Sequence, residues 1–404
     1  MNKIRIALIR EGKVPPDKRV PFSPVQVEEI LQDYPNAEVY CQHSDLRCFK
    51  DDEYRDLGIP VVEDISKCDI LMGIKEVPVH QLIPDKTYLF FSHTIKKQPY
   101  NRKLLQAILK KNIRMIDYET LRDSLGNRLV AFGRYAGIVG AYNGLWTYGK
   151  KHDLFSIRRA FECFDINDLK IELRKVALPP VKIILTGSGR VARGAMETLD
   201  SAGIRKVSPE DFLNKSFEVP VYVQLTSADY HRRNEGGHFN RHEFHEHPER
   251  YHSVFYDFLK HAQILMAGAF WNTKAPVLFT RQDMTQPWFK VDTIADITCD
   301  IRGSIPSTIR ATSIAEPVYD YDPVKDQDLP GFSDRNLITV MAIDNLPCEL
   351  PRSASEEFGR DLIDRILKPL LEGDVDHIIE RATITKAGKL TEGYLYLQDY
   401  VSAE

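Results

Sequence analysis

The sequence predicts an α/β protein made of two Rossmann-like, doubly wound units, each built on a largely parallel sheet. Short apolar stretches of strand length alternate with helical patterns in the N-terminal part, and the alternation resumes after residue 181. The chain has 404 residues, which is more than one ordinary hydrophobic core accommodates. Two units, the second of them dinucleotide-binding, account for both observations.

The N-terminal unit is expected to alternate strands and helices in chain order. Strands are predicted at Lys3–Leu8, Ala37–Tyr40, Ile70–Ile74, Tyr88–Phe91 and Ile113–Tyr118. Helices are predicted at Ser23–Leu31, Asp51–Leu57 and Asn101–Lys110, the first opened by a Ser-Pro pair at its N-cap and first-turn positions. A helix rich in glycine and alanine, Tyr135–Gly149, follows, and its small residues suit close packing against another element.

The second unit is expected to start at Val181–Gly194, where a strand pattern runs into a glycine-rich turn and then a helical pattern. This order is typical of the dinucleotide-binding fingerprint. Gly187 would make the tight turn, and Gly189 would let the backbone approach a pyrophosphate at the helix N-terminus. Arg190 could add a charge-assisted contact. No Lys-Ser or Lys-Thr pair follows the glycines, which argues against a nucleotide-triphosphate loop.

Further strands are predicted at Ile204–Val207, Val221–Leu225, Ile264–Phe270, Val291–Ile297 and Leu337–Ile343. If the first of these is the second strand of the nucleotide fold, Ser208 stands where NAD enzymes carry an acidic residue on the ribose 2′-hydroxyl. Ser208 with nearby Arg205 fits a 2′-phosphate slightly better, while Glu210 lies two residues on, so the choice between NAD and NADP stays open. Ser353 and Glu356 have the spacing of a capping box for a C-terminal helix.

Composition excludes several classes of protein. The hydrophobic fraction of 43% and charged fraction of 28% are those of a globular protein, and a net charge of −4 gives no reason to expect nucleic acid or a membrane surface as partner. The apolar runs are too short to cross a bilayer, and the N-terminus reads as a strand rather than a signal peptide. Six scattered cysteines favour a reducing compartment, so we expect a cytoplasmic protein.

Chemistry-bearing side chains follow several strands of the N-terminal unit, where ligands of parallel sheets bind. These side chains and those of the neighbouring loops are Arg19, Lys75, Glu76, His93, Glu119 and Arg128. Arginines bind carboxylates through two hydrogen bonds, and lysine and histidine can transfer protons. Taken singly, Lys75 and Glu76 are more often solvated residues at the end of a strand, and His93 is more often a hydrogen-bonded histidine of the core. Together they predict an acid–base reaction on a dicarboxylate.

The motifs of the N-terminal unit are DKRVPFSP, GIKEVP, FFSHTIKKQ, RMIDYE and RLVAFGRYAG. Those further along are LTGSGRVARGA, HPERY, TRQD, ADITCDIRGSIP and AIDNLPCELP. On these motifs the chain resembles the lysine-forming saccharopine dehydrogenases, and most of all their lysine–ketoglutarate reductase branch. That family belongs with alanine dehydrogenase and the transhydrogenase nucleotide-binding subunit. The motifs occur in family order up to about residue 355.

The resemblance implies a role for each matching residue. Lys75 and His93 match the proton-transfer pair. The positions that match substrate contacts are Arg19, Gln98, Arg128 and Phe132, and those that match carboxylates beside the catalytic lysine are Glu76 and Glu119. The pyrophosphate loop is matched by Gly187, Ser188, Gly189, Arg190 and Val191, and the segment over nicotinamide and substrate by Asp296 and Asp300.

The resemblance also implies an activity and a domain layout. The implied reaction is the reversible NAD(P)-dependent condensation of L-lysine with 2-oxoglutarate to saccharopine, in lysine metabolism. The implied catalytic domain is discontinuous, 1–136 with 336–404, around an NAD(P)-binding Rossmann domain at 137–335 and a cleft between the two. The expected ligands are therefore small molecules (lysine, 2-oxoglutarate, saccharopine, NAD or NADP), without nucleic acid or membrane. The oligomeric state is not predicted.

Two other functions stay open. One is a different amino-acid dehydrogenase of the same superfamily, although two arginines and Gln98 favour a ligand with several carboxylates. The other is a catalytically silent dinucleotide-binding regulator, against which Lys75 and His93 argue. A cluster of histidines between His231 and His252 invites a zinc interpretation, but no convincing helical pattern supports it, so no metal is expected.

Overall fold

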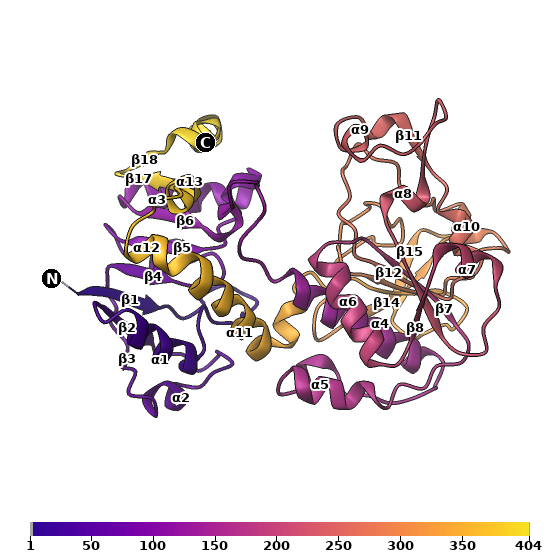
Figure 1. Ribbon diagram of the computed structural model, residues 1–404, viewed down its shortest axis with the longest axis horizontal. Coiled ribbons are helices and arrows are strands. Elements are labelled where there is room, and N and C mark those ends of the chain that lie inside the picture. Colours follow the sequence, from indigo (N-terminus) through magenta and orange to yellow (C-terminus); the bar gives the residue numbers. More distant parts are fainter. Residues whose placement is uncertain (1–2, 404) are drawn as a thin grey trace. The chain divides into compact units, whose positions relative to one another are not determined.

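The computed structural model describes residues 3–403 and divides into two compact units. Unit 1 comprises the chain up to Phe132 and again from Pro351 onward, and unit 2 comprises Gly133–Leu350. Each unit contains one eight-stranded, mostly parallel sheet with helices (Figure 1). The predicted fold class is confirmed.

The sheet of unit 1 has the strand order β18-β17-β6-β5-β4-β1-β2-β3. Its strands are β1 (Ile4–Leu8), β2 (Ala37–Gln42), β3 (Val61–Val62), β4 (Ile70–Met72), β5 (Thr87–Phe90), β6 (Arg114–Asp117), β17 (Thr383–Lys386) and β18 (Lys389–Leu390). The first six pair in parallel, and β17 and β18 add an antiparallel edge that the sequence did not suggest.

Helices cover both faces of this sheet because consecutive residues of its strands are apolar and point to opposite faces. On one face, Ile6 and Met72 pack with α1 (Pro24–Asp33) and α11 (Pro351–Leu362). On the other face, Ala7 and Leu71 pack with α3 (Arg102–Lys110). The short helices are α2 (Asp51–Arg55), α12 (Lys368–Leu371), α13 (Ile378–Ala382) and α14 (Gln398–Ser402).

The two predicted helix starts have different outcomes. Ser23 caps α1 as expected, because its hydroxyl accepts from Gln26 N while the Gln26 side chain accepts from Ser23 N. The capping box at Ser353 is wrong, since α11 already begins at Pro351 and Ser353 lies buried within its first turn. Because β16 still belongs to unit 2, the chain returns to unit 1 at residue 351 rather than at the expected 336.

The sheet of unit 2 has the strand order β15-β14-β16-β13-β12-β7-β9-β8. Its strands are β7 (Lys182–Thr186), β8 (Arg205–Val207), β9 (Val221–Leu225), β12 (Ile264–Ala267), β13 (Thr293–Asp296), β14 (Val318–Asp322), β15 (Gln327–Pro330) and β16 (Ile338–Met341). Strands β14 and β15 are antiparallel to the rest. A separate antiparallel hairpin joins β10 (His231–Arg233) to β11 (Tyr251–Ser253).

One strand assignment needs correction. The strand expected to lie second in the nucleotide fold, β8, is at the edge of the sheet, and β9 lies between it and β7, whose other neighbour is β12. Strand β9 has four buried residues among five, whereas β8 is three residues long and mostly exposed. A long buried strand fills an interior position better, and a short polar one suits an edge.

The helices of unit 2 include a close pair, α4 (Gly133–Lys151) and α6 (Arg190–Ser201). A β-carbon at Gly137 would lie 1.9 Å from the carbonyl oxygen of Val191, and one at Gly194 would lie 1.9 Å from that of Arg134. The prediction that small residues let this helix pack closely is confirmed. The other helices are α5 (Ile166–Leu173), α7 (Pro209–Asn214), α8 (Ser227–Tyr230), α9 (Arg241–Glu246) and α10 (Tyr256–Leu259).

Two further findings concern the described residues 3–403. None of their helices combines the length and the apolar character needed to span a bilayer. All six cysteines are free thiols.

Candidate active site

The first part of the site lies where β1 and β4 end side by side. The two carboxylate oxygens of Glu11 accept hydrogen bonds from the backbone nitrogens of Ile74 at 2.6 Å and Lys75 at 2.9 Å. Burial and the nearby Asp17 raise the pKa of Glu11 to about 8, although these two hydrogen bonds oppose the rise. Glu11 thus fixes the backbone from which the half-buried Lys75 side chain extends.

Glu76, the next residue, lies turned into the protein. Only 8% of it is exposed, and its Oε2 lies 2.7 Å from the Lys13 ammonium. Its other oxygen, Oε1, is buried and has no hydrogen-bond partner among residues 3–403. A buried carboxylate with one free acceptor can receive a hydrogen bond from a ligand or a mobile side chain.

His93 follows β5 and has an unusual backbone. Its φ of 54° lies in the left-handed region, which non-glycine residues enter at a cost. Neighbouring hydrogen bonds hold it there: the buried Asp117 at the end of β6 accepts from both the nitrogen and the hydroxyl of Ser92. The imidazole stacks on the Phe91 ring with centroids 6.3 Å apart. The strained turn thus gives the imidazole a defined position.

Three basic side chains surround the carboxylate of Glu119, which follows β6. Its carboxylate lies 3.2 Å from His93 Nδ1, 3.4 Å from Lys96 Nζ and 4.0 Å from Arg128. Burial opposes the charge, but these partners lower the pKa of Glu119 to about 2. His93 Nδ1 thus contacts the Glu119 carboxylate and also lies 3.3 Å from Lys96 Nζ, so both neighbours hold the ring through this nitrogen.

The remaining predicted substrate residues have different surroundings. Arg19 is 3% exposed and forms a bidentate pair with Asp17, at 3.0 and 2.6 Å, while its guanidinium lies 4.1 Å from the centre of the Phe132 ring. Phe132 stacks on Phe358. Gln98 is exposed and accepts from the hydroxyl of Tyr100. Contacts therefore link His93, Glu119 and Arg128 directly, and Arg19 to Phe132, while Gln98 stands apart.

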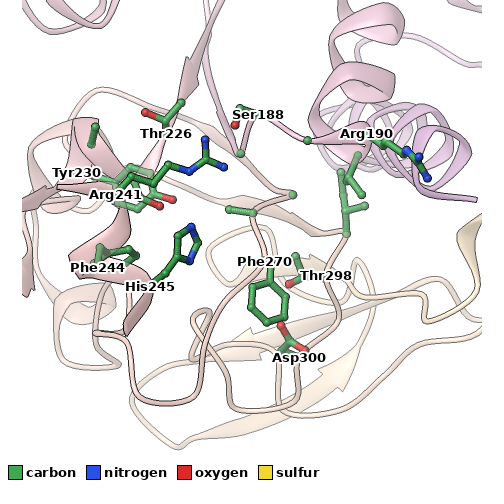
Figure 2. Close-up of a pocket in the computed structure, with 18 of the residues that line it drawn as sticks. Ser188, Arg190, Thr226, Tyr230, Arg241, Phe244, His245, Phe270, Thr298 and Asp300 are labelled. Carbon is green, nitrogen blue, oxygen red and sulfur yellow. The ribbon is translucent and has the colours of Figure 1, made fainter. Parts of the chain in front are cut away.

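Unit 2 contains a separate cavity of about 780 Å³ beside the glycine turn (Figure 2). Gly187 has a φ of +104° and sits against the backbone of Gly268 and Ala269, where a β-carbon would lie within 3.1 Å. A β-carbon at Gly189 would meet nothing within 4 Å. The first glycine therefore serves the turn, and the second leaves open space in front of α6.

Most of the predicted cofactor residues line this cavity, but two do not. Lining residues include Gly187, Ser188, Gly189, Arg190, Val191 and Asp300. Asp296 is fully buried and instead accepts hydrogen bonds from Thr298 and Thr308, which shapes the loop that carries Asp300. Ser208 is the N-cap of α7, where its hydroxyl accepts from Asp211 N, because its strand lies at the sheet edge.

Sequence reasoning missed several residues of both sites. Glu11 directly follows the first strand region, so the rule about strand ends could have found it. Thr226 follows β9, the true neighbour of β7, and lines the cavity with Arg241 of α9. Phe270, which follows β12, also lines it with its ring 89% exposed, an unusual state for a large apolar side chain.

The histidines between 231 and 252 do not form a metal centre. No group of three or more His, Cys, Asp or Glu side chains within residues 3–403 is placed to hold a metal ion. His231 is buried, and burial lowers its pKa to about 4, so it is neutral at ordinary pH. His245 lines the cavity beside the glycine turn.

The fold and the glycine-turn cavity define a class of protein: two α/β units, one of them with a cavity beside a glycine-rich strand-to-helix turn. Solved structures share this fold. An L-alanine dehydrogenase superposes with a TM-score of 0.66 at 14% identity, covering 99% of this chain and all of that one. A transhydrogenase from Sinorhizobium meliloti gives a TM-score of 0.59 at 12% identity, covering 96% and 98%.

Sequence comparison is more specific. Residues 7–139 match the family model described as alanine dehydrogenase/PNT, N-terminal domain. The chain is 31% identical to the mitochondrial alpha-aminoadipic semialdehyde synthase of Mus musculus, over 98% of its own length and 48% of that protein. It thus spans about half of that curated relative.

A second kind of relative is matched along nearly its whole length. The chain is 24% identical to a protein of Emericella nidulans named saccharopine dehydrogenase [NAD(+), L-lysine-forming], over 91% of this chain and 92% of that one. The resemblance predicted from the motifs is confirmed.

Proposed function

We propose that the protein is an NAD(P)-dependent oxidoreductase acting on CH–NH groups, a saccharopine dehydrogenase of the L-lysine-forming type. One structural observation carries the proposal: Lys75, His93 and Glu119 follow the neighbouring strands β4, β5 and β6. A proton acceptor, an ammonium and a carboxylate at one sheet edge suit reversible imine chemistry. The name of one relative supplies saccharopine and lysine as substrate and product, and 2-oxoglutarate is the keto acid that the motif resemblance implies.

The cavity of unit 2 fits a nicotinamide dinucleotide. It has the size of a cofactor site, and Gly189 leaves room for a pyrophosphate before the uncapped N-terminus of α6. Ser188, Arg190 and Val191 would hold this part of the cofactor, and Asp300 and Phe270 line another side. When bound, the cofactor supplies hydride transfer. The protein supplies binding, orientation and proton transfer.

Proton transfer is assigned to two side chains of unit 1. Because Glu119 and Lys96 hold the ring through Nδ1, His93 would use Nε2 to take a proton from the hydroxyl of a carbinolamine, or to return one. Lys75 would exchange a proton, through its own Nζ, with the amine nitrogen of the substrate lysine. Glu11 holds the backbone of Lys75, and Glu119 contacts the imidazole of His93 at 3.2 Å and so orients it.

Arg128 is the better candidate for a substrate carboxylate. It is partly exposed and lies 4.0 Å from Glu119, in the same cluster as His93, where its guanidinium fork suits a ligand carboxylate. Arg19 already has a close carboxylate partner in Asp17, so its role would be to shape the wall formed by Phe132.

A steady-state assay tests the proposal. The purified chain is mixed with NADPH or NADH, and the decrease in absorbance at the nicotinamide band is followed. Oxidation should require lysine and 2-oxoglutarate together, and saccharopine should be the product by mass spectrometry. Turnover with a different amino acid would instead indicate another dehydrogenase of this superfamily. Dinucleotide binding without turnover on any of these substrates would indicate a regulator.

A further inference from the structure

The chain makes an unusual excursion after β9. Residues 227–253 form α8, the β10–β11 hairpin and, between its strands, the short helix α9. An aromatic group holds the excursion together, with Phe244 of α9 packed against His231 and Tyr251. Because Phe244 is buried in this group, its neighbours Arg241 and His245 are held along the wall of the dinucleotide cavity.

The end of β9 carries no acidic side chain toward the cavity. Since β9 is the neighbour of β7, the residue after it, Thr226, occupies the place at which NAD enzymes carry an acid for the ribose 2′-hydroxyl. The nearby Asp229 does not line the cavity, and its Oδ2 is engaged by the nitrogen and hydroxyl of Thr226, at 2.6 and 2.8 Å. Asp229 is therefore turned to Thr226 and is not available to bind a ribose 2′-hydroxyl from the cavity wall.

Arg241 differs from the other arginines of the excursion. Arg233 and Arg250 both pair with Glu243, at 3.0 and 3.1 Å, and Arg232 donates to the carbonyls of Ala228 and His231. The side chain of Arg241 makes no hydrogen bond or ion pair within residues 3–403, although acidic residues lie close in sequence.

The direction of the Arg241 side chain indicates what it could bind. Figure 2 shows the guanidinium of Arg241 pointing toward the side of the cavity that holds Thr226 and Ser188, with the His245 ring also turned into the cavity. The guanidinium fork matches the oxygens of a phosphate. His245 is four residues further along α9, on the same face, and can donate a second hydrogen bond.

We propose that Arg241, assisted by His245, binds a phosphate on the 2′-position of the adenosine ribose, so that the cavity selects a 2′-phosphorylated dinucleotide. The inference rests on the proposed function only in taking the cavity as a dinucleotide site. It assigns cofactor choice to the excursion and not to Ser208, which caps α7 outside the cavity.

Adenosine fragments test this without any turnover. The full chain is titrated calorimetrically with adenosine 2′,5′-bisphosphate and with adenosine 5′-monophosphate, which differ only in the 2′-phosphate. The wild type should bind the bisphosphate at least about 10-fold more tightly. Arg241→Ala should weaken the bisphosphate by about 10- to 100-fold, the usual value of a charged hydrogen-bonded contact, and leave the monophosphate unchanged.

Arg250→Ala is the matched control, since it removes a cation of the same excursion that does not line the cavity. It should leave the preference for the bisphosphate intact. A complementary variant, Thr226→Asp, should lower affinity for the bisphosphate and not for the monophosphate, because it places a carboxylate where the phosphate binds.

Three results would overturn the inference: equal affinity of the wild type for the two fragments, an Arg241→Ala variant that weakens both fragments by the same factor, or one that weakens neither. Titration with NADH and NADPH separates this failure from failure of the proposed function. A protein that binds and turns over both cofactors equally would refute only the role of Arg241 and would leave the proposed function standing. A protein that binds neither fragment and neither cofactor would refute both.

Discussion

The two candidate sites are built in opposite ways. The cavity of unit 2 depends on the absence of side chains at two positions, since Gly187 allows the turn and Gly189 leaves open space before α6. The cluster of unit 1 is formed by charged and polar contacts. Glu119 contacts three basic side chains, and Glu11 accepts hydrogen bonds from two backbone nitrogens. The first site is therefore sensitive to added atoms and the second to altered charge.

The largest expected effect tests the charge-sensitive site. Lys75→Met removes the proposed proton carrier, so kcat should fall by about 10²- to 10⁴-fold while affinity for the dinucleotide stays the same. Steady-state kinetics and cofactor titration measure the two quantities. Lys103→Met, on the exposed side of α3, is the control and should keep full activity. If turnover and cofactor affinity fell together, Lys75 would be structural.

An added methyl group tests the space-limited site. Gly137→Ala places a β-carbon against the Val191 carbonyl, so α4 and α6 must separate. We expect a loss of about 1–3 kcal/mol in the free energy of unfolding and weaker dinucleotide binding, because α6 carries the glycine turn. Urea unfolding and cofactor titration measure both. Gly393→Ala, where a β-carbon meets nothing within 4 Å, should change neither. Unchanged stability of Gly137→Ala would contradict the close packing.

Glu11 predicts a pH dependence of stability. Its pKa is raised from 4.5 to about 8 in the folded protein, so its contribution is fully present below pH 4.5 and is lost as the pH rises through 8. Glu11→Gln cannot ionise and keeps only one carbonyl oxygen for the two N–H groups. It should be less stable than the wild type at pH 5 by about 2 kcal/mol, and the gap should close and then reverse before pH 8, because three pH units below the raised pKa correspond to about 4 kcal/mol. Chemical unfolding at the two pH values measures this, and a constant gap would contradict it.

Glu119 predicts a pH dependence of stability of opposite sign and smaller size. Because its pKa falls from 4.5 to about 2, its contribution is present above pH 4.5 and is lost as the pH falls toward 2. Glu119→Gln should cost about 1 kcal/mol at pH 6 and almost nothing near pH 2. Equal destabilisation at both pH values would mean that packing, and not charge, stabilises this group.

The sequence predicted the local features of both units well. The alternation of strands and helices, the cap at Ser23, the glycine turn and the close packing of α4 follow from neighbouring residues. The order of strands did not, because hydrophobic patterns of β8 and β9 say that both are strands and not which one pairs with β7. Ser208 was assigned to the cofactor for that reason.

Side-chain partners were equally beyond local reasoning. The motifs named Arg19, but not that Asp17 engages it so closely. Arg241 stands out only once the structure shows which arginines of the excursion already have acidic partners. Such pairings depend on residues brought together by the fold, and no spacing in the sequence records them.

The left-handed backbone of His93 sets function against stability at one residue. A β-carbon in this conformation costs about 1 kcal/mol or more, and glycine would avoid the cost. His93→Gly would therefore relax the turn after β5 while deleting the imidazole. Glycine would be the more stable residue at this position, and the imidazole proposed for proton transfer is held here at that cost.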